Sequence, residues 1–234
     1  MFQQRFSLSL IGLGCLALSA CGGSSNNSQP APEPDPVSYS YEVTVQNLTQ
    51  GQPLSPVAIV LHNNVTLWTI GEPATVALEV LAEGGDGSDF IGDDSFYASM
   101  TGTAPIGAGA SDTLTITVTD EAESFISVAT MLVNTNDAFA GISGHSLAEL
   151  TLNDTMVMML PVLDAGTEAN SEAAGTIPGP ADDGEGFNSE RDDADVVSFH
   201  PGVVSGEDGL TLSVLTSAHR FDNPAVKLSI TRVE

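Results

Sequence analysis

Carboxylates follow two apolar segments of the chain, and their types and spacing could bind a metal ion. Asp137 comes shortly after the apolar run 125–133, and Asp164 and Glu168 come shortly after the apolar run 155–162. If these two predicted strands end close together, the three carboxylates converge. Ca²⁺ prefers several oxygen ligands, and flexible loops commonly supply them. The pattern is therefore compatible with a calcium site.

The same loops also fit an ordinary alternative. Asn and Asp side chains stabilise turns by accepting hydrogen bonds from nearby backbone N–H groups. Gly166 permits a tight backbone turn, which would let Asp164 and Glu168 face one point. From spacing alone, turn chemistry and a metal site both stay open.

A further acidic stretch, residues 182–195, holds seven Asp and Glu residues. Its acids do not follow the fixed alternate spacing and final Glu of an EF-hand loop. A run of like charges is typical of a solvated surface loop. We therefore expect this segment to be an acidic loop without a metal of its own.

Signatures of common enzymes are missing from the sequence. The four His residues form no HxxxH or HxH pair of the kind that zinc hydrolases use, and neither a GxSxG elbow nor a P-loop occurs. A pair of carboxylates for glycoside hydrolysis stays open, but one Trp and three Tyr offer few sugar platforms. We expect no enzyme activity, and a carboxylate-dependent glycoside hydrolase is the less favoured alternative.

The charge balance restricts the class of partner. Five Lys and Arg residues stand against 31 Asp and Glu, which gives a formal net charge of -26. Such a charge repels nucleic acid and anionic lipid surfaces, and it favours divalent cations or basic partners. We therefore expect no nucleic-acid binding.

The N-terminus is typical of a bacterial export signal. Arg5 precedes an apolar run, residues 6–18, and the small residues Ser19 and Ala20 lead to Cys21. A run this short predicts a signal peptide over residues 1–20 rather than a membrane-spanning helix. The pattern resembles a lipobox, in which the thiol of Cys21 receives a lipid.

The residues after Cys21 support the same interpretation. Residues 21–37 are rich in Ser, Asn and Pro, as a flexible tether between a lipid anchor and a folded domain requires. We expect a membrane-anchored protein of the cell envelope. Gly22 rather than Asp follows Cys21, and the sorting rule for lipoproteins then favours the outer membrane, at its periplasmic face or at the cell surface. Cys15 lies in the predicted signal peptide, so the mature domain would contain no disulfide.

The remainder of the chain predicts an all-β fold. Alternating or apolar segments predict strands, turn residues separate them, and the pattern favours an antiparallel sandwich. We expect one short helix over 72–82, where Pro73 suits the first turn, and long acidic loops over 165–209. The expected strands are 38–48, 57–62, 114–118, 125–133, 155–162, 210–216 and 225–233, with a brief extended piece at 65–70.

Several segments together resemble the spondin N-terminal domain, a family found in animal matrix proteins and in bacterial exported proteins. The clearest is 163–168 (LDAGTE), and the others are 41–48, 67–71, 131–141 and 223–233. The resemblance implies an eight-stranded antiparallel β-sandwich over 38–234, with a calcium site at one end.

The family's metal-binding carboxylates fall on Asp137, Asp164 and Glu168 of this chain. Glu168 departs from the animal pattern, which has Asp there, and Leu163 stands where the animal domains have Trp. The predicted function is an envelope-anchored, calcium-binding, non-catalytic module for adhesion or for binding an unknown protein or glycan. The alternative is a metal-free structural envelope lipoprotein.

Overall fold

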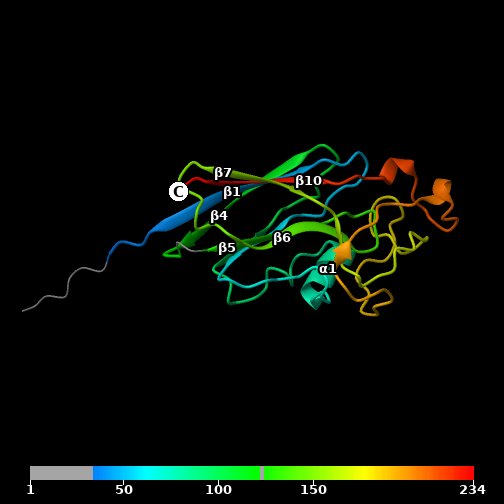
Figure 1. Cartoon of the computed structure of the whole chain (residues 1–234), viewed down its shortest axis with the longest axis horizontal. Coiled ribbons are helices and arrows are strands. Elements are labelled where there is room, and N and C mark those ends of the chain that lie inside the picture. Colours follow the sequence, from blue (N-terminus) through cyan, green and yellow to red (C-terminus); the bar gives the residue numbers. More distant parts are fainter. Residues whose placement is uncertain (1–33, 122–123) are drawn as a thin grey trace, which may run out of the picture. The chain divides into compact units, whose positions relative to one another are not determined.

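Two antiparallel sheets pack face to face as a β-sandwich (Figure 1). The computed structural model describes residues 34–121 and 124–234. The predicted signal peptide, Cys21 and most of the predicted tether lie outside the described residues. Among those described, no helix has the length and apolar character needed to cross a bilayer.

The first sheet has four strands and one solvent-facing side. In β1, Tyr41, Val43 and Val45 are buried while Glu42 is exposed, so the strand alternates as its sequence predicted. The inward residues of all four strands form the core between the sheets. In spatial order the strands are β4 (Ser111–Thr119), β1 (Ser38–Asn47), β10 (Val226–Arg232) and β7 (Thr155–Leu160).

The second sheet has six strands and is covered on both faces around its centre. All five residues of β2 are buried: Ile59 and Leu61 face the sandwich core, whereas Ala58 and Val60 pack in a second cluster with helix α1. This explains the continuous apolar run in the sequence. In spatial order the strands are β3 (Ala98–Thr101), β2 (Ala58–His62), β5 (Phe125–Met131), β6 (Ala138–Ser146), β8 (Leu163–Asp164) and β9 (Ser198–Phe199).

The helix α1 spans Val76–Gly84, so the predicted range 72–82 begins too early and ends too early. Thr75 is its N-cap, and the Thr75 hydroxyl accepts a hydrogen bond from the backbone N–H of Leu78 at 3.2 Å. This cap sets the start of the helix, and Pro73 lies before it. Gly85 ends the helix in the left-handed conformation, with φ +70°.

Several sequence predictions about strands are corrected by the structure. The segment 210–216 is not a strand: it contributes one isolated bridge, Ala173 with Ser213, between the short 3-10 helices Gly206–Asp208 and Ser217–His219. The piece 65–70 forms no strand.

The strand β6 was not predicted, because its glycines and polar residues hide the alternation. The described residues hold ten strands rather than eight, since β8 and β9, of two residues each, extend the second sheet. The all-β sandwich with one α-helix and long loops is confirmed.

The chain changes sheets after β7, and this crossing positions the predicted site. Leu160 ends β7 in the first sheet, and Leu163 begins β8 in the second. There β8 pairs with the start of β6, so Asp164 lies opposite Ala138. Asp164 therefore reaches the neighbourhood of Asp137 by joining the sheet of β6.

Candidate cation site

Asp137 is the most enclosed of the predicted site residues. It is 0% exposed in the loop between β5 and β6. Its Oδ2 accepts hydrogen bonds from the backbone N–H groups of Thr167 at 2.8 Å and Glu168 at 3.2 Å. Its Oδ1 is buried and has no hydrogen-bond partner among the described residues. A buried carboxylate oxygen without a partner is costly.

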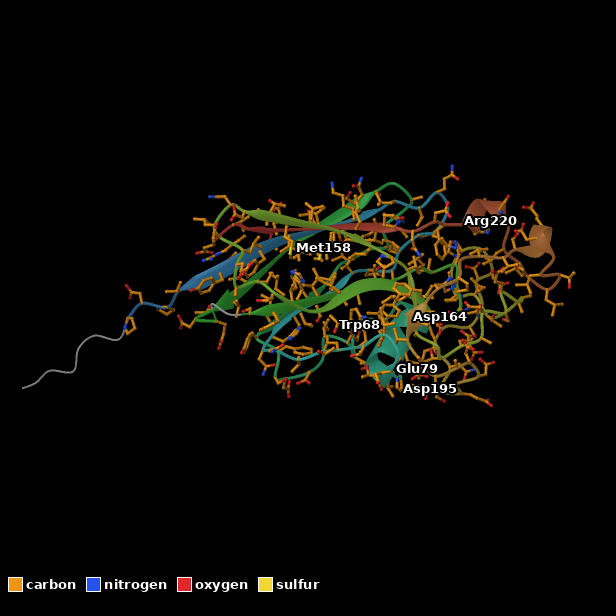
Figure 2. The ribbon with its side chains drawn as sticks, in the orientation of Figure 1. Trp68, Glu79, Met158, Asp164, Asp195 and Arg220 are labelled. Atoms are coloured by element: carbon orange, nitrogen blue, oxygen red, sulfur yellow. The ribbon has the colours of Figure 1, made fainter. Side chains whose placement is uncertain are left out.

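Asp164 is buried at the end of β8 (Figure 2). Its Oδ1 accepts a hydrogen bond from the Gly166 N–H at 2.8 Å, and its Oδ2 accepts one from Asn170 Nδ2 at 2.6 Å. Gly166 has φ +72°, and a Cβ at this position would lie 2.4 Å from the carbonyl oxygen of Val196. The tight turn that the sequence indicated therefore requires glycine.

Glu168 follows this turn, and its backbone N–H donates the hydrogen bond to Asp137 Oδ2. Its side chain is partly buried. Burial, together with the like charges of Glu83 and Asp137, raises the pKa of Glu168 to about 8. The turn therefore brings Glu168 near Asp137.

Glu83 belongs to the same cluster, and sequence reasoning missed it. It is 1% exposed in the last turn of α1, its Oε2 accepts a hydrogen bond from the Asn188 N–H at 2.9 Å, and its Oε1 has no partner among the described residues. Burial raises its pKa. The predicted helix stopped at residue 82, so Glu83 was left outside it. An acidic residue on the apolar face of an amphipathic helix is the signal that could have identified Glu83.

The four acids form one electrostatic unit, which we call the carboxylate cluster: Glu83, Asp137, Asp164 and Glu168. Burial, together with the negative charges of Asp164 and Glu83, raises the pKa of Asp137 to about 7. None of the three ion pairs found among the described residues involves a member of this cluster. Acidic side chains are therefore gathered here without an ion pair among the described residues, and the one basic side chain that acts on the cluster, Arg191, lowers the pKa of Glu83 but pairs with Glu79 and Asp195.

The donor set fits a hard cation by chemistry. All the available groups are oxygens, and both Asp137 and Glu83 keep one oxygen free of hydrogen bonds. Within residues 34–121 and 124–234, however, no three His, Cys, Asp or Glu side chains already form the arrangement of a metal site. Ligation would require these side chains to close around the ion.

The loop before Asp137 does more than stabilise its own turn. Asn134 Oδ1 accepts a hydrogen bond from the Ala181 N–H at 3.0 Å, and Asn136 Oδ1 accepts one from the Glu172 N–H at 3.2 Å. Both partners are more than 30 residues away along the chain. Local turn chemistry is present here too, since the Thr135 hydroxyl donates to the Leu132 carbonyl oxygen at 2.6 Å and accepts from the Ala138 N–H at 3.1 Å. Asn134 and Asn136 in addition hold the long loops in place.

The acidic stretch 182–195 is fixed to the sandwich at several points. Arg191 donates a hydrogen bond to Glu79 on α1 at 2.6 Å and also pairs with Asp195. The Asp192 carboxylate accepts a hydrogen bond from the Ala169 N–H at 2.8 Å. The segment is a loop, as predicted, but some of its charges anchor it rather than only face the solvent.

No protein-family model matches the chain, and no curated protein matches it.

Proposed function

We propose that this protein is a non-catalytic binding module of the cell envelope whose carboxylate cluster binds Ca²⁺. Asp137, Asp164, Glu168 and Glu83 would hold the ion. The observation that carries the proposal is Asp137: it is completely buried, one of its oxygens has no partner among the described residues, and it lies within electrostatic reach of three further acids. A cation would balance this charge and would be coordinated by the oxygens that have no hydrogen-bond partner.

The positions of the four acids support a structural use of the ion. Glu83 comes from α1, Asp137 from the loop between β5 and β6, Asp164 from β8, and Glu168 from the loop that follows it. When bound, the ion would supply positive charge that links these elements. The long loops over 165–224 would then be held at one end of the sandwich for contact with a ligand.

The remaining parts of the proposal come from the sequence. The resemblance to the spondin N-terminal domain favours a calcium site at Asp137, Asp164 and Glu168, and adhesion or ligand binding as the use. The lipobox-like segment favours export and a lipid anchor at Cys21, in the outer membrane at either face. The unknown partner would be a protein or a glycan.

Thermal melting of the full chain in millimolar CaCl₂ and in EDTA tests the calcium site. Since a ligand that binds only the folded state stabilises it, we expect Ca²⁺ to raise Tm by about 5–10 °C at concentrations near a hundred times Kd. Asp164→Asn should remove this shift, while Asp94→Asn, which alters an exposed acid outside the cluster, should preserve it. Identical melting curves with and without Ca²⁺ would instead favour the metal-free structural alternative.

A further inference from the structure

A pocket of about 720 Å³ opens at the end of the sandwich that carries the long loops. Three separate segments line it: residues 48–50 after β1, residues 201–203, and a third segment that includes Arg220, Phe221 and Asp222. Arg220 lies in the loops at this end (Figure 2). Pockets of this volume are typical of small-molecule sites.

One wall of the pocket is tied to the carboxylate cluster. Asn170, which donates to Asp164, accepts a hydrogen bond from His200 Nε2 at 2.9 Å, and His200 Nδ1 accepts one from the Gly202 N–H at 2.9 Å. His200 is buried, and burial lowers its pKa to about 4, so the ring is neutral at physiological pH. The His200 ring also packs against Phe221, with 5.5 Å between ring centroids.

Residues next to the lining residues Gln50, Ser217 and Arg220 are tied to the loop that contains Asp137. Gln52 Nε2 donates hydrogen bonds to the carbonyl oxygens of His219 at 2.8 Å and Asn134 at 3.1 Å. A Cβ on Gly51 would lie 2.1 Å from the carbonyl oxygen of Ala218, so glycine is needed for this close approach. These contacts hold in place the segments that carry Gln50 and Arg220.

The lining indicates the chemistry of the occupant. Arg220 supplies hydrogen-bond donors, Asp222 supplies acceptors, and Gln50 and Ser217 supply both. Phe221 adds one partly exposed aromatic ring. Arg220 is paired with Asp208, which lies outside the lining, so Asp222 is the lining charge left to accept hydrogen bonds from ligand hydroxyl groups. This carboxylate and the net charge of -26 disfavour an anionic ligand.

We infer that this pocket binds a neutral sugar unit of a glycan, with its hydroxyl groups bonded to the polar lining and its apolar ring face against Phe221. The inference deepens the proposed ligand-binding function and rests on it. A single ring can accommodate one sugar, so the scarcity of Trp and Tyr in this chain is compatible with such a site.

The test is binding of the full chain to an array of neutral oligosaccharides (glucans, galactans and mannans) and anionic ones (alginate and sulfated galactans), in EDTA and in CaCl₂. The best neutral hit is then titrated by calorimetry. We expect binding to neutral members, at least tenfold weaker for Asp222→Ala and for Gln50→Ala. Asp94→Ala, which removes an exposed carboxylate that does not line the pocket, should bind like the unmodified chain.

The outcomes separate this inference from the calcium proposal. Sugar binding in EDTA that Asp222→Ala weakens supports the pocket even if Ca²⁺ gives no thermal shift. No binding to any neutral oligosaccharide in either buffer overturns the inference, as does a preference for the anionic members. Equal affinity of the Asp222→Ala and Gln50→Ala variants and the unmodified chain would place any sugar elsewhere, provided that their melting temperatures show intact folds.

Discussion

Glu79 and Glu83 lie one helical turn apart on α1, and both are almost fully buried. Glu79 receives the Arg191 guanidinium at 2.6 Å (both Glu79 and Asp195, the second partner of Arg191, are labelled in Figure 2). Glu83 instead has no ion-pair partner among the described residues: it accepts a hydrogen bond from the Asn188 N–H, and burial raises its pKa more than its hydrogen bonds and the charge of Arg191 lower it. The same residue type on the same helix face is thus ion-paired in one place and not in the other.

The difference shows how burial and a partner act separately on a carboxylate. A buried charge is tolerated when a nearby opposite charge and hydrogen bonds replace its hydration. With burial alone, the charged form is disfavoured and the pKa rises, as it does for Glu83 and for Asp137. Arg191, one of the five basic residues of the chain, pairs with Glu79. The carboxylate cluster has no such ion pair among the described residues, so its charge would be balanced by bound protons or by a cation from solution.

The largest expected effect comes from removing the partner of Glu79. Arg191→Met leaves the Glu79 carboxylate buried without a cation, and we expect the free energy of unfolding to fall by about 3 kcal/mol. The control is Arg220→Met, which breaks the exposed pair with Asp208 and should cost at most about 1 kcal/mol. Urea denaturation measures both. If both variants lost the same free energy of unfolding, burial would not make the Arg191–Glu79 pair more important than the exposed Arg220–Asp208 pair.

The second expectation concerns pH in EDTA. The folded state keeps a proton on Asp137 up to pH about 7, whereas the unfolded chain loses it near the ordinary value of 3.8. Between these values the folded state binds more protons, so its stability is greatest at low pH and falls as pH rises. From pH 5 to pH 8 we expect a loss of about 2 kcal/mol.

Asp137→Asn should reduce this decline without abolishing it, because Glu168, with its pKa raised to about 8, titrates in the same range. Saturating Ca²⁺ should reduce the decline in the unmodified chain. The measurement is urea denaturation across pH 5–8. Asp94→Asn serves as the exposed control and should keep the slope. A stability that rises over this range in EDTA would contradict an uncompensated cluster.

The smallest effect is expected from neutralising Glu83. Glu83→Gln removes one of the like charges and keeps an oxygen for the Asn188 N–H, so in EDTA at pH 8 we expect a gain of about 1 kcal/mol. The same variant should bind Ca²⁺ at least tenfold more weakly by calorimetry. Glu72→Gln, at an exposed position just before α1, should change neither quantity. If Glu83→Gln instead destabilised the protein in EDTA, the Glu83 carboxylate would stabilise the fold rather than repel its acidic neighbours.

The sequence determined the features that depend on local patterns. Alternation in β1 and the apolar runs of β2 and β5 follow directly from which faces of each strand are buried. The carboxylates Asp137, Asp164 and Glu168 could be named because each follows an apolar segment and Gly166 marks a turn. Helix α1 was placed within a few residues, since its cap and apolar residues lie close together in the chain.

Only the tertiary structure decided which acids lie together and which are balanced. Glu83 joins Asp137 because α1 packs on the second sheet, and Asp164 joins them because the chain crosses between sheets before β8. Arg191 reaches Glu79 across 112 residues of sequence. The pKa of a carboxylate depends on burial and on charges a few ångströms away, and such neighbours come from contacts between distant segments that no local pattern of residues encodes.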